Sequence, residues 1–131
     1  MIRFLDTYGL FAWVNTKEKH HVAAKSLMAG VGDRYVTTDC VLLEFADGMV
    51  DPLNRPLAVA MIRLMRTTPI FDIVCCDTVV FEAGLDLYSR RPDKDWSLTD
   101  CISFEMMKTR GIVEAVTGDH HFRQAGFHPM F

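Results

Sequence analysis

Short apolar runs alternate with segments of helical spacing along the chain, and this alternation limits the fold more than any other feature. The apolar runs cover residues 2–5, 34–37, 70–75 and 112–117, and each is followed by residues with a helical period. Strands that alternate with helices pair in parallel, because each helical crossover returns the chain to the same end of the sheet. The sequence therefore predicts an α/β fold in which helices flank a mainly parallel central sheet.

Caps and stop signals set the limits of the expected helices. Gly30 and Gly111 follow two of them as stops, and Thr38 or Asp39 can cap a third. The expected helical segments are one ending near Val14, then residues 19–29, 38–49, 54–65, 77–91 and 97–110, and a short turn through Phe122.

The segment from Leu57 to Met65 is apolar on nearly every side of its expected helix. Such a helix is covered either by the core of its own chain or by a partner. Both explanations stay open at this point, and the second one predicts self-association, for example as a homodimer.

Length and charge narrow the class of protein. The 131 residues suit one compact domain, which we expect to span residues 1–131. No stretch of about 18 residues lacks charge, and the first residues lack the pattern of a signal peptide, so we expect a cytoplasmic protein with no membrane span. The net charge of −3 argues against a protein held to nucleic acid mainly by a basic face, but it leaves nucleic acid open as a substrate.

Cysteine and histidine residues form no recognisable metal motif. The cysteines at 40, 75, 76 and 101 include no CxxC pair, which is poor spacing for a zinc site or a disulfide framework. We expect them to be reduced and mostly buried. The histidines include two neighbouring pairs, at 20–21 and 120–121, and no HExxH motif, so we expect solvated or capping roles for all five.

Four acidic residues stand out by their positions. In parallel sheets the ligand crevice lies outside the carboxyl ends of the strands, and Asp6 and Asp119 each follow such an end. Asp100 comes three residues after Ser97, in the pattern of a capping box, while Glu44 interrupts an apolar run in mid-helix. Each acid also has a purely structural explanation, which is helix capping for the three aspartates and a surface position for Glu44.

The order of these acids and the residues around them resemble the PIN-domain ribonucleases of the VapC toxin type. The matching segments are Asp6-Thr7 after the first strand, TTDCVLLE ending in Glu44, SLTDCISFEMMKTRGI with Asp100, and AVTGDHHFRQAGF with Asp119. The resemblance covers essentially the whole chain. It implies a PIN-like three-layer sandwich in which four acids converge to bind Mg²⁺ or Mn²⁺ and cleave RNA; these acids are Asp6, Glu44, Asp100 and Asp119.

The resemblance also implies a toxin whose partners are an RNA substrate and a small cognate antitoxin protein. An all-carboxylate set selects hard cations, which provide a nucleophile near neutral pH and neutralise charge that develops on a phosphate. The hydroxyls of Thr7, Thr99 and Thr117 are expected to support the acids, whereas the roles of Asp93 and Asp95 stay open.

Two other functions compete with a nuclease. A binding module that kept the fold and lost its activity would have replaced one of the four acids, and none is replaced here. An aspartyl phosphotransferase of one superfamily would carry a second aspartate two residues after Asp6, where this chain has Tyr8. The sequence therefore favours the metal-dependent ribonuclease.

Overall fold

The computed structural model describes all 131 residues, and its five strands form a single sheet in the order β3-β2-β1-β4-β5. All neighbouring strands are parallel, and Phe4 of the central strand is paired with Val36 on one side and with Ala115 on the other. The strands are β1 (Ile2–Leu5), β2 (Arg34–Thr38), β3 (Phe71–Val74), β4 (Glu114–Val116) and β5 (His128–Pro129). The predicted α/β fold with a parallel sheet is confirmed. Strand β5 is not predicted by the sequence, because two residues, one of them proline, leave no apolar pattern.

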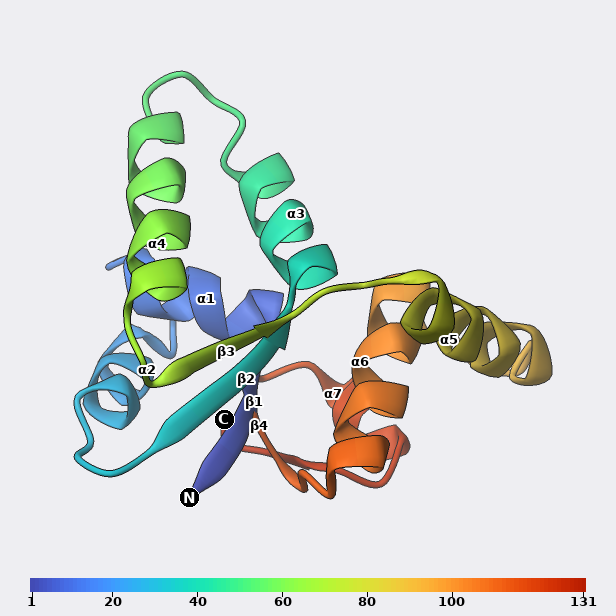
Figure 1. Ribbon diagram of the computed structural model, residues 1–131. Helices are drawn as coiled ribbons and strands as arrows, with labels where there is room; N and C mark the ends of the chain where they lie inside the picture. Colours follow the sequence, from blue (N-terminus) through green and yellow to red (C-terminus); the bar gives the residue numbers. More distant parts are fainter.

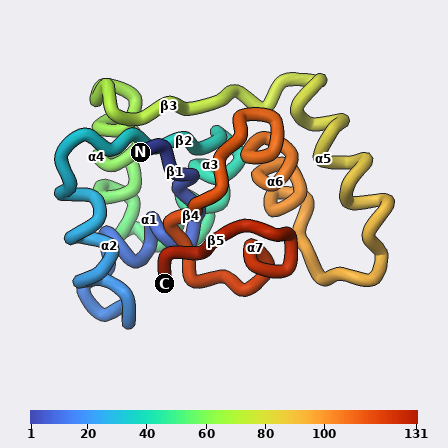
Figure 2. The backbone as a smooth tube through the Cα atoms, turned by 90° about the horizontal axis from the view of Figure 1, so that it is seen from below, coloured from blue at the N-terminus to red at the C-terminus, as the bar shows by residue number.

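Seven helices cover the two faces of this sheet. The first group is α1 (Thr7–Val14), α2 (His21–Met28), α3 (Asp39–Gly48) and α4 (Arg55–Thr67). The second group is α5 (Thr78–Arg90), α6 (Leu98–Arg110) and α7 (His120–Gln124). The two groups lie on opposite sides of the sheet, as Figures 1 and 2 show. None of the helices combines the length and the apolar composition that crossing a membrane requires.

The strand order creates a crevice between β1 and β4. The chain moves outward from β1 to β2 and β3, and then returns through α5 and α6 to place β4 on the other side of β1. The helices that follow β1 and β4 therefore leave toward opposite faces, and ligands of open α/β sheets bind at such a switch point. Asp6 directly follows β1, and the segment from Thr117 to Asp119 directly follows β4.

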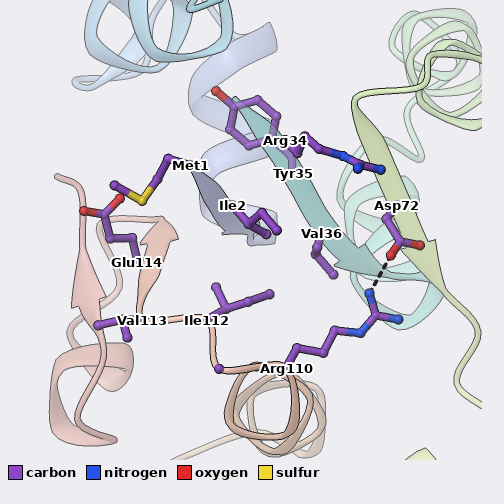
Figure 3. Close-up of a pocket in the computed structure, with 11 residues that line it drawn as sticks. Met1, Ile2, Arg34, Tyr35, Val36, Asp72, Arg110, Ile112, Val113 and Glu114 are labelled. Atoms are coloured by element: carbon purple, nitrogen blue, oxygen red, sulfur yellow. Dashed lines mark hydrogen bonds and ion pairs between the residues drawn. The ribbon is translucent and has the colours of Figure 1, made fainter. Parts of the chain in front are cut away.

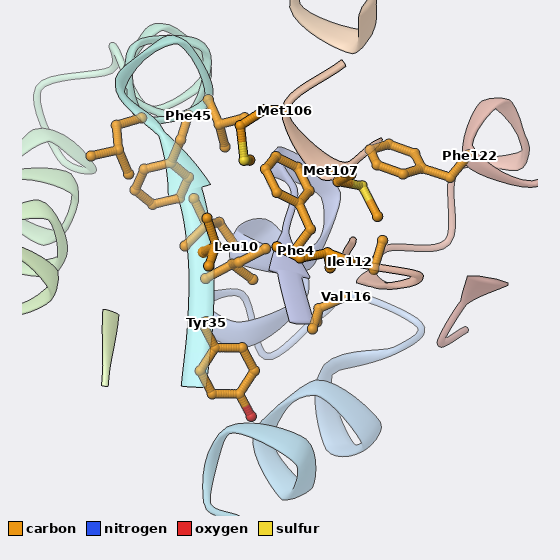
Figure 4. Packing of buried hydrophobic residues seen from close by; sticks show 14 of the residues in the cluster. Phe4, Leu10, Tyr35, Phe45, Met106, Met107, Ile112, Val116 and Phe122 are labelled. Atoms are coloured by element: carbon orange, nitrogen blue, oxygen red, sulfur yellow. The ribbon is translucent and has the colours of Figure 1, made fainter. Parts of the chain in front are cut away.

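The buried core fixes the elements that surround this crevice. It contains 21 apolar residues from strands and helices of both groups, which interdigitate around β1 in Figure 4. The Phe122 ring of α7 lies 6.1 Å from the Phe4 ring of β1 and 5.0 Å from the Phe104 ring of α6. A Cβ added to Gly9 would lie 2.1 Å from the carbonyl oxygen of Val116, so α1 can lie against the end of β4 only with glycine at this position.

The core covers helix α4 only on one side. Of its residues only Ala58 and Met65 are buried, whereas Leu57, Val59 and Leu64 are exposed. Figure 1 shows α3 and α4 projecting together from one side of the sheet. The chain's own core therefore covers one side of this helix, where Met61 and Ile62 also pack, and a partner for the exposed apolar side chains stays a prediction.

Candidate functional site

Asp6 occupies the N-cap position of α1 but does not cap the helix. No N-cap hydrogen bond connects its carboxylate with the α1 backbone two or three residues later. The residue is only 5% exposed, and its Oδ2 accepts a hydrogen bond from the Thr117 hydroxyl at 2.9 Å. Capping therefore does not explain Asp6, whose carboxylate is buried at the switch point of the sheet and held from the neighbouring strand.

The surroundings of Asp6 disfavour its negative charge. Burial, followed by the charges of Asp100 and Glu44, raises the pKa of Asp6 to about 7, against the opposing effect of the hydrogen bonds from Thr117 and from the Thr7 backbone. A cation would compensate for these unfavourable contributions, because it attracts the buried charge and offsets the repulsion between the carboxylates. The site is thus electrostatically matched to a positive ion.

A buried hydroxyl beside Asp6 lacks a partner. The Oγ1 atom of Thr7 is buried and makes no hydrogen bond. Leaving such a group unpaired costs free energy unless a water or an ion occupies the space beside it. The oxygen donors of Thr7 and Asp6 therefore fit a hard, partly hydrated cation such as Mg²⁺ or Mn²⁺.

Asp100 serves as a helix cap and as a site residue at the same time. The predicted capping box is confirmed, because the Ser97 backbone donates to Asp100 Oδ2 at 3.1 Å and the Asp100 backbone donates to Ser97 Oγ at 3.0 Å. The same Oδ2 lies 3.2 Å from Nδ1 of His121. Burial, followed by the charge of Asp119, raises the pKa of the Asp100 carboxyl, although its hydrogen bonds act in the opposite direction.

Asp119 is joined to both of the other aspartates through its neighbours. Its Oδ1 caps α7 by accepting from the His121 backbone at 2.9 Å, and lies 3.4 Å from Nδ1 of that histidine. The hydroxyl of Thr117 accepts from the Asp119 backbone at 3.0 Å while it donates to Asp6. The structure thus brings Asp6, Asp100 and Asp119 together, with Thr117 as one link and His121 as the other.

The remaining predicted groups contribute less to this arrangement. Glu44 is exposed on α3 and forms no hydrogen bond or ion pair, so a surface position describes it, although its charge reaches Asp6. Thr99 makes no side-chain contact with the acids and only accepts a bond from Ser103 through its carbonyl group. Asp93 forms an exposed ion pair with Arg91 at 2.9 Å, which explains its position without a site role.

His121 is a site residue that the sequence analysis missed. Its side chain is 19% exposed and lies between Asp100 and Asp119, so the solvated or capping role expected for all five histidines is wrong for this one. Donor atoms of Asp119, His120 and His121 lie within 4.8 Å of one another, so the cluster is not all-carboxylate. The available signal was the position of His121, two residues after a strand-end aspartate on a short helix.

The expectation for the cysteines needs a similar correction. All four are free, but only Cys101 is buried, while Cys75 is exposed and Cys40 and Cys76 are half-buried. The three that are not buried lie at the ends of β2 and β3, where the sheet edge leaves them open to solvent.

A cavity of about 720 Å³ lies at the opposite end of the sheet, at the amino ends of the strands. Figure 3 shows its lining, in which Arg110 pairs with Asp72 across one side. It contains no convergent acids, and its floor is apolar, with Ile2, Val36 and Ile112. The chemistry therefore points to the crevice around Asp6 and not to this cavity.

Comparisons with known proteins agree with the geometry. The model of the PIN domain family matches residues 3–128. The crystal structure of VapC20 from Mycobacterium tuberculosis, described as a sarcin–ricin loop cleaving toxin, is similar with a TM-score of 0.86 and 26% identity over 97% of this chain and 96% of that one. FitAcB from Neisseria gonorrhoeae has a TM-score of 0.69 and 17% identity over 100% of this chain and 97% of that one. VapBC2 from Rickettsia felis, bound to a promoter DNA fragment, has a TM-score of 0.70 and 13% identity over 98% of this chain and 97% of that one. The comparison with curated protein sequences gives no match.

Proposed function

Because this chain belongs to the PIN domain family, we propose that it is a metal-dependent endoribonuclease. It acts in the cytoplasm as the toxin of a toxin–antitoxin pair, and one domain over residues 1–131 forms the enzyme. The observation that carries the proposal is the buried carboxylate of Asp6, which caps no helix and lies beside Asp100. Burial and the neighbouring carboxylates disfavour its charge, a bound cation would compensate for this, and a hard divalent ion suits its oxygen donors.

The protein's own residues have distinct tasks in this mechanism. Asp6, Asp100 and Asp119 would hold Mg²⁺ or Mn²⁺, and Glu44 would complete the set from α3. The ion, when bound, supplies an activated water and neutralises charge on the phosphate. The Thr117 hydroxyl fixes one oxygen of Asp6. Nδ1 of His121 faces two carboxylate oxygens, so it carries a proton and lowers the repulsion between Asp100 and Asp119.

The substrate proposal is single-stranded or looped RNA. Proteins that recognise a particular RNA sequence contact unstacked bases, which are found mainly in single-stranded loops. VapC20 is described as cleaving the sarcin–ricin loop, so a ribosomal RNA loop is the first substrate to test here, followed by tRNA and mRNA.

Cleavage is expected to require a divalent metal ion. Purified protein incubated with a panel of structured RNAs should cut at least one of them in Mg²⁺ or Mn²⁺ and should lose this activity completely in excess chelator, since the carboxylates alone provide no activated water. Gel analysis of end-labelled RNA measures the products. Cleavage that continued in the chelator would refute the metal mechanism.

The two functions of the Ser97-Asp100 pair should separate in variants. Ser97→Ala removes only a cap, so it should lower the stability by about 1 kcal/mol and leave cleavage and the thermal response to Mg²⁺ intact. Asp100→Asn should lose most of the Mg²⁺ response together with cleavage. Thermal melts with and without Mg²⁺ measure both effects. An Asp100→Asn variant with the native Mg²⁺ response would show that Asp100 is only a cap.

Expression of the chain by itself should arrest bacterial growth. The arrest should be absent for Asp6→Asn and relieved by co-expression of the cognate antitoxin. FitAcB and VapBC2 share the fold of this chain, and we propose that an antitoxin covers the acidic crevice. Growth curves, with immunoblots to confirm equal expression, are the measurement. Equal growth of the native and Asp6→Asn strains, with RNA cleavage also absent in vitro, would favour an inactive binding module instead.

Exposed apolar side chains on α4 suit a protein partner. Leu57, Val59 and Leu64 are all exposed on this helix, which projects from the sheet beside α3. Exposed apolar residues gathered on one element indicate a contact surface. We therefore include a homodimer, or the antitoxin at this surface, in the proposal.

A further inference from the structure

A second group of metal-binding side chains lies on the same edge of the sheet, outside the crevice around Asp6. The last residues of β2 and β3, Thr38 and Val74, are neighbours in the sheet register. Asp39 and Cys40 directly follow the first of these strands, and Cys76 comes shortly after the second. A carboxylate oxygen of Asp39 and the Sγ atoms of Cys40 and Cys76 all lie within 4.8 Å of one another.

We propose that Asp39, Cys40 and Cys76 bind a thiophilic divalent cation, for which Zn²⁺ is the representative. Two sulfurs at about 2.3 Å from a tetrahedral ion stand about 3.8 Å apart. The three donor atoms therefore need only small side-chain rotations to converge on one ion. Mg²⁺ and Mn²⁺ prefer oxygen ligands, so the two thiolates give this site a metal preference different from that of the crevice around Asp6.

Asp39 is oriented as a ligand and is not needed as a cap. The cap of α3 is Thr38, whose hydroxyl oxygen accepts from the Val41 backbone at 3.2 Å. Oδ1 of Asp39 accepts from the Cys76 backbone at 2.9 Å, which holds the carboxylate next to both sulfurs. A hydrogen bond that orients a ligand from behind is a typical feature of protein metal sites.

The charges around the cluster favour a bound cation. Two thiolates and a carboxylate around a divalent ion give a complex of charge −1, after the two thiols have released their protons. Asp39 and Cys40 are the first two residues of α3, where the positive end of the helix dipole stabilises such a complex. Arg66, which lines a cavity of about 460 Å³ together with Asp39 and Cys75, is a nearby positive charge.

A disulfide between Cys40 and Cys76 is the competing use of these sulfurs. Oxidation of a thiol proceeds through the thiolate. The negative charge of Asp39 beside both sulfurs disfavours the thiolates until a cation compensates for it. The carboxylate therefore favours metal binding, in which it is a ligand, over a disulfide, in which it has no role.

A bound ion would add a second link between two segments that the sheet edge and the hydrogen bond from the Cys76 backbone to Asp39 already connect. Figure 1 shows the connection from β3 to α5 running past the base of α3. Glu44 lies four residues after Cys40 and thus on the same face of α3. The ion would stabilise the first turn of α3, the helix that also carries Glu44.

Titration with Co²⁺ in a non-thiol reductant tests the site. Thiolate bound to Co²⁺ gives an intense near-ultraviolet charge-transfer band, which oxygen and nitrogen ligands do not produce. The native protein and Cys75→Ser should both show the band, whereas Cys40→Ser and Cys76→Ser should lose it. Zn²⁺ should abolish the band by displacing Co²⁺, and a large excess of Mg²⁺ should leave it unchanged.

Thermal melting provides a second measurement. Zn²⁺ at about 100 times its Kd should raise the Tm of the native protein by about 5–10 °C. Asp39→Asn keeps both sulfurs and the shape of the side chain, and Zn²⁺ should raise its Tm clearly less. This variant replaces the cysteine variants in the test if they fail to fold. A native protein without the cobalt band, or a band that persists in both Cys40→Ser and Cys76→Ser, would overturn the proposal. Asp6→Asn should retain the band, so the result does not depend on nuclease activity.

Discussion

Replacing Asp6 with asparagine should abolish RNA cleavage while the metal-free protein becomes as stable as the native one or more stable. Asparagine keeps the shape of the side chain and can still accept the hydrogen bond from Thr117, but it brings no negative charge to a cation. Loss of a residue that only supports a metal ligand typically lowers metal affinity or activity about 10–100-fold. Loss of a direct ligand should therefore lower kcat/KM by more than about 100-fold. Stability should not fall, because a buried charge is removed.

The matched control is Asp93→Asn, which makes the same chemical change at an exposed ion pair with Arg91. Its cleavage rate should be native, because Asp93 has no role in the proposed site. Its stability should also be close to native, because exposed ion pairs contribute little to stability. The measurements are kcat/KM in Mg²⁺ and the free energy of unfolding in chelator. A rate for Asp6→Asn within about tenfold of the native one would remove Asp6 from the proposed metal ligands.

The metal-free protein should lose stability as the pH rises from about 4 to about 7. The pKa of Asp6 is raised from 3.8 to about 7 in the folded state, mainly by burial. In that pH range the folded protein holds a proton on Asp6 that the unfolded chain has already released. The folded state is therefore favoured at the low end of the range, and this contribution is lost as the pH passes through 7. The shift corresponds to a loss on the order of 4 kcal/mol.

Urea unfolding at a series of pH values, in chelator, measures this loss. Asp6→Asn should show a much flatter dependence between pH 4 and 7, because the titrating group is gone. A small slope of the same sign should remain, since burial also raises the pKa of Asp100. Mg²⁺ should restore stability at pH 8 in the native protein by binding the ionised carboxylates. Equal pH profiles for the native protein and Asp6→Asn in chelator would contradict the burial of an ionisable group at this position.

Local sequence patterns were sufficient for most of the secondary structure. The alternation of apolar runs and helical segments predicts the parallel sheet, and Ser97-Asp100 predicts the cap at the start of α6. The helix stop at Gly111 is likewise local, because its φ of 67° is a conformation that favours glycine. These features depend on neighbours within a few residues, so they can be read along the chain.

The composition of the site depended on contacts between distant segments. His121 lies next to Asp100 because α6 and α7 both pack their phenylalanine side chains into the core beside β1. The sequence indicated four acids and excluded histidine, because two histidines that are neighbours in sequence do not have the spacing of a known metal motif. Glu44 was the reverse case: its interruption of an apolar run suggested a buried acid, but α3 turns this side chain to solvent.

The sequence by itself determined the order of the helices and of the first four strands, the helix caps and the positions of Asp6, Asp100 and Asp119 at element ends, because caps and periodicity are local. Only the tertiary structure decided which of these acids meet, that Asp6 is buried instead of capping α1, and that Leu57, Val59 and Leu64 of α4 stay exposed. It also decided that Cys40 and Cys76 come together across β2 and β3. Sheet order and helix packing set these contacts, and both arise from the burial of apolar surface between segments that are far apart in the chain.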